Sequence, residues 1–459
     1  MDEKKSKKIL LLLFLGVLMG ALDISIVGPA LPSIQETIAI DKRNLSWIFT
    51  IYVLFNLVGT PLMSKMADIY GRKSTYISSL IIFGLGSLLV SLSNSFELLL
   101  VGRGIQGFGA SGIFPVATAI IGDIFPPEKR GQKLGLIGAV FGIAFIIGPI
   151  IAGFLLMINW HWLFIINLPI IVFLVIWGLK ILPANKSVKK GKFDYQGMIV
   201  IGLLLTSFSF GINNIETKDF FHSLATIKVA PLLIVAVILV FIFRMIEKKA
   251  SDPILKLNNF NSRQVKIASI LAMAAGVFET TMVFIPDYAV EAFHVTASKA
   301  SFMLIPVIIA LAITAPISGK MLDKIGSKIV IITGTSSVAI GLLLLSVSAE
   351  NMILFYSSEV LIGIGLSMLL GASIRYIMLN EVPATERTSI QGVITIFTSI
   401  GQMSGAATAG AVVDSYGGNI EAYSYAYLAV SIFTFGIVFI SFFLKNRKEE
   451  LETIARNSI

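Results

Sequence analysis

Two carboxylic acids lie inside long apolar stretches of the sequence, where charged groups are rare. Asp23 stands within LFLGVLMGALDISIV, and Glu279 within ILAMAAGVFETTMVF. An ionised carboxylate in such a stretch is costly unless water or a partner stabilises it. Burial favours the protonated form, so such a group can hold a proton in one state and release it in another. Both acids are therefore candidates for proton coupling or for attracting a cationic molecule. The alternative is a hydrogen bond between helices with no role in turnover.

Three further charged residues are candidates for the same chemistry. Arg103 lies within an apolar run and needs an acidic or carbonyl partner there. Its alternative role is a purely structural ion pair. Glu359 and Asp287 lie closer to the ends of their runs, where contact with water is the alternative to a coupling role. Arg375 is the other arginine within an apolar run.

The sequence has few residues that could support thiol, metal or nucleotide chemistry. The chain has no Cys and only three His, which are His161, His222 and His294. Disulfides and thiol nucleophiles are thus excluded, and we expect no metal site. GFGASG at 107–112 fits a dinucleotide-binding pattern, but that pattern requires a preceding strand and here lies within an apolar run. No ATP-binding GxxxxGK[ST] motif is present. We expect no enzyme activity and no cofactor.

The composition indicates an all-α integral membrane protein. Of 459 residues, 56% are hydrophobic and only 14% are charged, whereas soluble domains average about 25% charged residues. An apolar run of about 20 residues crosses a bilayer as one helix. Fourteen such runs are present, at 9–31, 44–63, 75–93, 98–121, 134–157, 162–182, 196–212, 228–246, 265–286, 299–318, 328–348, 353–377, 388–412 and 423–444.

The basic residues predict the orientation of the chain. Cytoplasmic loops are enriched in Lys and Arg. With both termini inside the cell, most of the basic residues fall inside, including Lys186, Lys189, Lys190 and Lys192 as well as Lys445, Arg447 and Lys448. The outside loops then hold Lys42, Arg43, Lys218, Lys228 and Lys299. The net charge of +9 therefore indicates topology, and we expect no nucleic-acid partner.

The chain contains an internal repeat. Residues 61–73 read PLMSKMADIYGRK, and residues 316–328 read PISGKMLDKIGSK. The register continues elsewhere with a drift of one or two residues, and the positions paired by it are Asp23 with Glu279, Arg103 with Glu359 and Arg130 with Arg387. The repeat predicts an N-terminal six-helix half at 1–185, a two-helix insert at 186–255 and a C-terminal six-helix half with a tail at 256–459. Parallel repeated halves are a transporter architecture, with the substrate site between them.

Several segments resemble the major facilitator superfamily, and within it the fourteen-helix drug:proton antiporters. SKMADIYGRK resembles the superfamily signature GxLADrxGRK, although Ser64 replaces its first Gly; the second copy has Gly319. RGIQGFGASG, GIAFIIGPIIAG and LDISIVGPALPSI resemble the motifs of the fourth, fifth and first helices. The resemblance covers nearly the whole chain. It implies a major facilitator fold with fourteen membrane spans.

The resemblance also assigns roles to residues. It implies a latch that closes the cytoplasmic side, with the residues Asp68, Gly71, Arg72, Lys73 and Asp323. It implies proton transfer at Arg103. It associates the fifth helix with antiport and with bending of tightly packed helices, through the residues Gly142, Gly148, Pro149 and Gly153.

These observations lead to one functional expectation with alternatives. We expect a proton-driven antiporter that exports hydrophobic, cationic drugs, dyes or biocides across the cell membrane. Export or flipping of an amphipathic lipid or metabolite is the main alternative, and an uptake symporter is a further one. The expected partners are lipophilic small molecules, protons and membrane lipid. The expected state is a multi-pass monomer with both termini in the cytoplasm.

Overall fold

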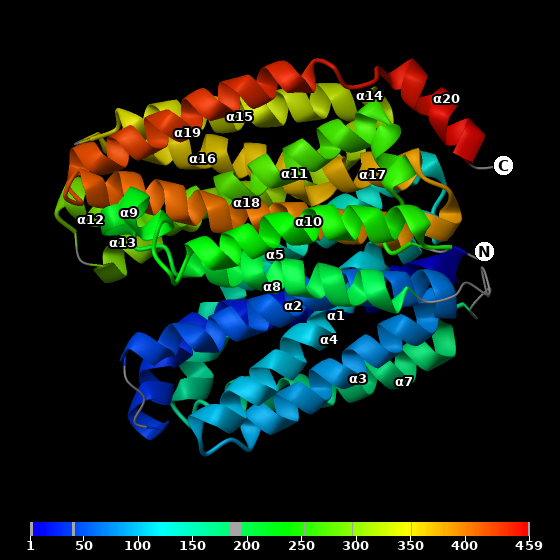
Figure 1. The fold of residues 1–459 in the computed structure, drawn as a ribbon, viewed down its shortest axis with the longest axis horizontal. Coiled ribbons are helices and arrows are strands. Elements are labelled where there is room, and N and C mark those ends of the chain that lie inside the picture. The colour runs from blue at the N-terminus through cyan, green and yellow to red at the C-terminus, as the bar shows by residue number, and fades with distance from the viewer. Residues whose placement is uncertain are drawn as a thin grey trace.

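The structure is a computed structural model that describes residues 3–38, 42–183, 194–251, 253–295, 297–349 and 351–457. Within these ranges the chain forms helices joined by short turns, and no strand occurs. The basic run at 186–192 lies outside the described residues. Figure 1 shows the helices as one elongated bundle, with both termini at the same end. We call this the terminal end, and the opposite one the far end.

The helices follow the repeat. The N-terminal half contains α1 (Glu3–Ile38), α2 (Lys42–Tyr70), α3 (Arg72–Ser91), α4 (Phe96–Ile124), α5 (Pro127–Leu156), α6 (Trp162–Ile165) and α7 (Asn167–Ile181). The insert contains α8 (Tyr195–Asn213), η1 (Thr217–Asp219), α9 (Phe220–Leu224) and α10 (Ala230–Lys249). The rest of the chain contains η2 (Leu257–Asn261), α11 (Arg263–Thr281), η3 (Met282–Phe284), α12 (Ile285–Phe293), α13 (Ala297–Met303), α14 (Ile305–Ile325), α15 (Ser327–Ser346), α16 (Met352–Met368), η4 (Leu369–Ser373), α17 (Ile374–Glu381), η5 (Ala384–Glu386), α18 (Arg387–Ser415), α19 (Ile420–Ser441) and α20 (Arg447–Asn457).

The number of membrane-spanning helices agrees with the fourteen apolar runs. Thirteen spans among the described residues are long and apolar enough to cross a membrane, and a bent pair within α5 brings the number to fourteen. The α5 axis bends by 41° between Ala144 and Ile147. Pro149 explains the position of the bend, because a proline ring clashes with the carbonyl four residues before it.

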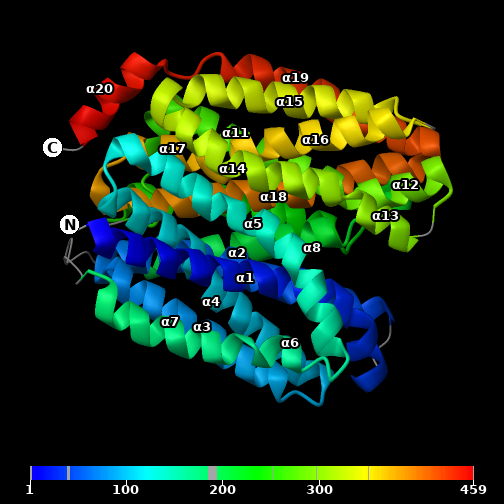
Figure 2. The same cartoon turned by 180° about the vertical axis from the view of Figure 1, so that it is seen from behind.

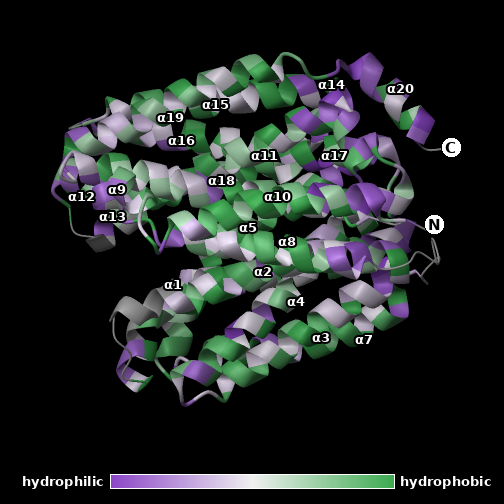
Figure 3. Cartoon of the chain, viewed as in Figure 1, coloured by the Kyte–Doolittle hydropathy of each residue, from purple (hydrophilic) through white to green (hydrophobic). Residues whose placement is uncertain are grey.

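Polar residues gather at the ends of the bundle and apolar residues cover its middle (Figure 3). The insert exposes many large apolar side chains, such as Ile234, Ile238 and Phe241 of α10. Such a surface suits lipid, and the polar ends suit water and lipid headgroups. The all-helical membrane fold predicted from composition is confirmed.

The C-terminal half has its own apolar core, whereas the main core of the N-terminal half also takes in Leu322 and Ala372 of the other half. The insert lies against the seam between the halves. Leu57 of α2 and Ile396 of α18 share one small cluster with Ile201 and Leu205 of α8 and Phe243 of α10. The insert helices thus bridge one helix of each half on the outside of the bundle. In the view from behind, α5 and α14 form the other seam (Figure 2).

Three features depart from the predicted runs. The ninth run continues through η3 into α12, which begins next to Pro286. The twelfth run is divided by η4, a π-helix. A π-helix accommodates one extra residue in a helix, which accounts for the register drift from 256 to 257 between the pairs Arg103–Glu359 and Arg130–Arg387. The third feature is α20, an amphipathic helix beyond the last span.

Candidate functional site

Asp23 and Arg103 form a completely buried ion pair within the N-terminal half. Arg103 Nη1 lies 2.7 Å from Asp23 Oδ2, and both side chains are 0% exposed. The other carboxylate oxygen accepts hydrogen bonds from Gln106 Nε2 at 3.1 Å and from Asn167 Nδ2 at 3.2 Å. A buried charge needs a partner of opposite sign and further hydrogen bonds, and Asp23 has both.

Neighbouring helices hold Arg103 in place. Its Nε donates to the Ile48 carbonyl at 3.2 Å, and its guanidinium carbon lies 4.3 Å from the centre of the Tyr52 ring. Gln106, one helical turn after Arg103, accepts from Nη1 at 2.8 Å and donates to Ser87 Oγ at 2.8 Å. Arg103 Nη2 is the one buried donor of this cluster without a partner in the described chain.

Glu279 has a different setting in the C-terminal half. Its Oε2 accepts a hydrogen bond of 2.6 Å from Gln402 of α18, and the residue is half-buried. Glu279 interacts electrostatically with Arg375, but no ion pair within 4.0 Å joins these two described residues. The repeat pairs Asp23 with Glu279, and in a transporter of this architecture the substrate site lies between the halves. In this conformation Asp23 is instead enclosed within its own half.

Glu359 and Asp287 do not join these clusters. The Glu359 side chain is 0% exposed, so the alternative of a water-exposed carboxylate does not hold in this structure. Neither of its oxygens has a hydrogen-bond partner among the described residues. Asp287, in the first turn of α12, is exposed. Glu359 is thus buried in α16, and Asp287 is in contact with the surroundings.

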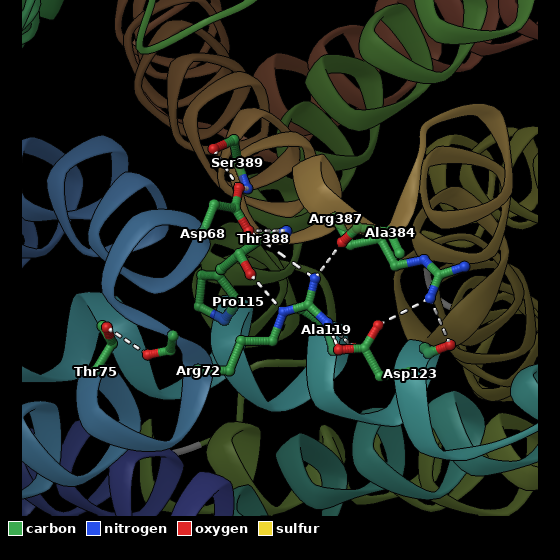
Figure 4. Close-up of polar contacts among 12 residues, drawn as sticks. Asp68, Arg72, Thr75, Pro115, Ala119, Asp123, Ala384, Arg387, Thr388 and Ser389 are labelled. Atoms are coloured by element: carbon green, nitrogen blue, oxygen red, sulfur yellow. Dashed lines mark hydrogen bonds and ion pairs between the residues drawn. The ribbon is translucent and has the colours of Figure 1, made fainter. Parts of the chain in front are cut away.

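The predicted latch residue Asp68 joins the two halves at the terminal end (Figure 4). Its carboxylate accepts hydrogen bonds from the backbone N–H of Thr388 at 3.3 Å and of Ser389 at 2.9 Å, and from Ser389 Oγ at 2.6 Å. These donors belong to the first turn of α18, where backbone N–H groups are otherwise unpaired and favour an anion. The main partner of Asp68 is thus the N-terminus of a helix in the opposite half.

Arg72 and Arg387 reinforce this seam through Asp123 of α4. Arg72 forms an ion pair with Asp123 and donates to the Ala384 carbonyl at 2.5 Å. Arg387 Nη1 lies 2.8 Å from Asp123 Oδ1. One acid from the N-terminal half thus holds an arginine from each half (Figure 4).

Asp323 makes the corresponding contact at the other seam. Its two carboxylate oxygens accept from the backbone N–H of Gly131 at 2.8 Å and of Gln132 at 2.9 Å, in the first turns of α5. Arg130 Nη1 also crosses between the halves and donates to Asn380 Oδ1 at 2.8 Å. Asp68 thus binds backbone N–H groups near the start of α18, and Asp323 binds those near the start of α5, in each case in the opposite half.

Gly71 and Lys73 have local roles. Gly71 has a φ of +96°, which few residues other than Gly adopt, and it allows the sharp turn from α2 into α3. Gly326 has a φ of +85° at the equivalent turn of the second copy. Lys73 Nζ donates to the Leu179 carbonyl at 2.6 Å within its own half. It does not bridge the seam in the contacts described.

The C-terminal helix α20 packs beside the second turn. Glu450 accepts from the Ser327 backbone N–H at 3.1 Å, and Arg447 Nη2 donates to the Asp323 carbonyl at 2.6 Å. Arg447 Nη1 donates to Tyr376 Oη at 3.0 Å. Burial raises the pKa of the Glu450 carboxyl, and the hydrogen bonds from Ser327 oppose that rise.

The glycines of α5 make close contacts of two kinds. A Cβ atom at Gly142 would lie 2.9 Å from Ala312 Cβ in the opposite half, whereas one at Gly148 would lie 2.0 Å from Ser25 Oγ in the same half. A Cβ at Gly153 would meet nothing within 4 Å. Contact between the halves along α5 thus runs from the terminal end to Gly142, and beyond the bend near Pro149 the glycines no longer touch the opposite half.

Sequence reasoning assigned no definite role to several residues of these sites. Gln106 and Gln402 are polar residues within apolar runs, and Asp123 lies two residues beyond the run at 98–121. Arg375 gave the strongest signal, as a second arginine within a span. The role of α20 had no signal, because its partners are backbone and hydroxyl groups of segments distant in the sequence.

Comparisons with known proteins agree with this architecture. The sequence pattern of the Major Facilitator Superfamily matches residues 13–254 and 267–458. The multidrug transporter protein MdtP of Bacillus subtilis is 33% identical over 91% of this chain and 78% of its own length. The riboflavin transporter RibZ of Clostridioides difficile is 28% identical over 73% of this chain and 72% of its own.

A solved structure shares the fold. The human organic anion transporter MFSD10 (TETRAN) superposes with a TM-score of 0.71 over 95% of this chain and 100% of its own, at 14% identity. The matched pattern covers nearly the whole chain, and the relatives include multidrug transporters. The chain therefore belongs to the major facilitator superfamily, in the branch that contains the multidrug efflux transporters.

Proposed function

We propose that this transporter exports hydrophobic compounds, chiefly lipophilic cations such as dyes and biocides, in exchange for protons. The observation that carries the proposal is the buried pair of Asp23 and Arg103 in a helix bundle whose two halves are latched at one end. A functional role is the default interpretation of an ionisable pair inside a membrane. The relatives that are named multidrug transporters support drug export.

The proposed transport cycle alternates between two arrangements of the halves. With both termini in the cytoplasm, the Asp68 and Asp323 contacts close the cytoplasmic side in the conformation described here. Export then requires that these contacts break to admit substrate from the inside and re-form to release it outside. The topology can be checked by cysteine labelling, because the native chain has no Cys. A Cys at position 189 should react only from the cytoplasm, and one in the 213–227 loop only from outside.

Asp23 is proposed as the coupling acid. A proton on its carboxylate removes the charge that attracts Arg103, so protonation and the ion pair exclude each other. A cationic substrate near Asp23 competes with the proton in the same way. One proton that moves inward through 100 mV supplies about 2.3 kcal/mol, and each unit of pH gradient adds about 1.4 kcal/mol. If one proton is exchanged for each neutral substrate molecule, this supports at least about tenfold accumulation.

The decisive experiment measures substrate-induced proton release from purified protein. Asp23→Asn should abolish that release and gradient-driven export, while counterflow of a neutral substrate persists as evidence of folding. Glu279→Gln is the matched variant in the other half, and it should chiefly weaken transport of cations. Release of as many protons by Asp23→Asn as by wild type would show that Asp23 is not the coupling acid.

Export of a metabolite is the second candidate function. The riboflavin transporter among the relatives favours it. A panel of dyes, biocides, riboflavin and lipids, tested in proteoliposomes with an imposed pH gradient, separates the two. Gradient-driven movement of riboflavin or lipid without movement of any dye or biocide would replace the first proposal by the second.

A further inference from the structure

We propose that Arg375 is a substrate-binding residue that selects aromatic molecules carrying an anionic oxygen. The inference rests on the proposed transport function and extends its substrate range from cations to aromatic acids. It starts from a guanidinium that the described structure leaves short of partners, at the place where the two halves meet.

Arg375 is buried but incompletely paired. Its side chain is 7% exposed, and a guanidinium has five N–H donors. Among the described residues it donates one hydrogen bond, from Nη1 to Gln391 Oε1 at 3.3 Å. No described carboxylate lies within 4.0 Å of it. Arg103, by contrast, has a carboxylate, an amide and a carbonyl as acceptors. An arginine inside a membrane needs such acceptors, so the N–H groups of Arg375 can donate hydrogen bonds to acceptor atoms of a ligand.

The position of Arg375 places it on the path between the halves. Arg375 is the second residue of α17, which directly follows η4. Gly138 of α5 in the other half packs against Gly371 of η4, and a Cβ placed on Gly138 would lie 2.6 Å from Gly371 Cα. The guanidinium carbon lies 3.9 Å from the centre of the Phe114 ring, which belongs to α4 of the N-terminal half. When the halves separate at this end, Phe114 must leave Arg375 and uncover the face of the guanidinium.

The repeat gives Arg375 no basic counterpart. After the π-helix the register offset is 257, which pairs Arg375 with Thr118. The arginine is therefore no requirement of the repeated fold. A π-helix inside an α-helix is frequently found at functional sites, and η4 ends two residues before Arg375.

The chemistry of the site defines the ligand. A guanidinium binds planar oxygen acceptors through paired N–H groups and stacks on aromatic faces. Phe114 already occupies the stacking face in this conformation, so an aromatic ring of the substrate can replace it in the opened one. Glu279 lies within electrostatic reach of Arg375 and receives cationic groups. The two residues together form a bipolar site, with Arg375 as its anion-selective part.

Two dyes with the same three-ring xanthene core test the inference. Fluorescein is anionic and rhodamine 6G is cationic. Binding of each to the purified full chain is measured by equilibrium dialysis, and transport is measured in proteoliposomes under a pH gradient. Arg375→Gln should lower fluorescein binding and transport at least tenfold and leave rhodamine 6G within about twofold of wild type. Arg375→Lys should restore part of the fluorescein signal, because it keeps the charge but loses the planar fork.

The control is Arg244→Gln, the same substitution at an exposed arginine of α10, which should change neither dye. An equal loss of both dyes in Arg375→Gln, or an unchanged fluorescein signal, would overturn the inference. So would wild-type protein that transports rhodamine 6G but neither binds nor transports fluorescein, and this result would leave the proposed function intact. Wild-type protein that moves neither dye and releases no proton on adding either would refute the proposed function and this inference together.

Discussion

The two seams between the halves occupy equivalent places in the repeat but are closed by different forces. At the α2–α18 seam, a Cβ on Gly392 would meet only side-chain atoms, with 2.5 Å to Ser64 Oγ and 3.1 Å to Ser64 Cβ. At the α5–α14 seam, a Cβ on Gly135 would lie 2.4 Å from the Ala315 carbonyl oxygen. Gly135 and Gly392 are equivalent in the repeat. The α5–α14 seam is thus packed backbone to backbone, and the α2–α18 seam leaves room for side chains.

The seam that is packed less closely, α2–α18, has the more strongly charged polar contacts. Asp123 at the α2–α18 seam forms ion pairs with two arginines. Its repeat equivalent, Asn380, is uncharged and accepts one hydrogen bond from Arg130. Close packing of small residues suits a pivot, because it involves no charges that must be solvated on movement. Ion pairs suit a latch, because water replaces their partners when it opens. The comparison assigns the pivot to α5–α14 and the latch to α2–α18.

The largest expected difference between the seams comes from adding one methyl group. Gly135→Ala forces a Cβ into a backbone carbonyl and should destabilise the protein by about 1–3 kcal/mol. Gly392→Ala meets a serine side chain that can rotate, and its cost should be well under half of that. Thermal unfolding in detergent compares the two. Equal losses of stability would contradict the assignment of a tight pivot and a looser latch.

The same comparison explains a deviation in the sequence motif. Ser64 replaces the first Gly of the loop signature, and the second copy keeps Gly319. A Cβ on Gly319 would lie 2.3 Å from the Gly131 carbonyl oxygen, so Gly is required there. Ser64 faces Gly392 instead, where its Cβ is accommodated.

Removal of the latch charge is the next test. Asp68→Asn replaces an acceptor of three hydrogen bonds and should cost the closed state about 2 kcal/mol, or about thirtyfold in the gate equilibrium. Asp323→Asn loses two bonds at a seam that packing also holds, and about 1 kcal/mol is expected. The measurement is the rate at which a cytoplasmic thiol reagent modifies Ser64→Cys, because Ser64 is 1% exposed in the closed gate. A larger effect of Asp323→Asn would reverse the assignment of latch and pivot.

Much of this architecture could be predicted from the sequence, because membrane spans and repeats are visible within a single continuous segment or by comparing two segments. Apolar runs fix the spans, and the repeat fixes which residues are equivalent. The partners of those residues depend on helix packing between segments hundreds of residues apart. The sequence thus singled out Asp68 but not the N-terminus of α18 as its partner, and it placed Glu359 at the register position of Arg103 without revealing that its oxygens lack partners.

Neutral substitution of the seam arginines should have smaller effects. Arg387→Gln loses the ion pair to Asp123, which is 35% exposed and therefore partly screened, and about 1 kcal/mol or fivefold in gate opening is expected. Arg130→Gln loses hydrogen bonds to Asn380 and to the Phe125 carbonyl but no ion pair. The change in gate opening caused by Arg130→Gln, relative to wild type, should be smaller and should vary much less with salt concentration. If raising the salt concentration weakens the gate equally in both variants, the charged and neutral seams are not distinct.

The smallest expected effect comes from α20, which supplies the second seam with an arginine that its loop lacks. Ser327 stands where the first copy has Arg72. Arg72 Nη1 contacts the Ala119 carbonyl, and Arg447 Nη1 contacts Tyr376, the repeat equivalent of Ala119. Arg447 thus brings a guanidinium to the equivalent residue from a separate helix, although it contacts the Tyr376 hydroxyl and not the backbone carbonyl.

Arg447→Ala should therefore speed gate opening by about threefold, since a contact that is partly exposed contributes less than about 1 kcal/mol. Lys448→Ala, at the next residue of the same helix, is the control for general loss of charge from α20. Arg72→Ala should have the larger effect, because Arg72 also holds Asp123. If Arg447→Ala leaves the modification rate of Ser64→Cys unchanged, α20 covers the second turn without bracing it. The α5–α14 seam is then held by packing, the Asp323 contact and the Arg130–Asn380 hydrogen bond.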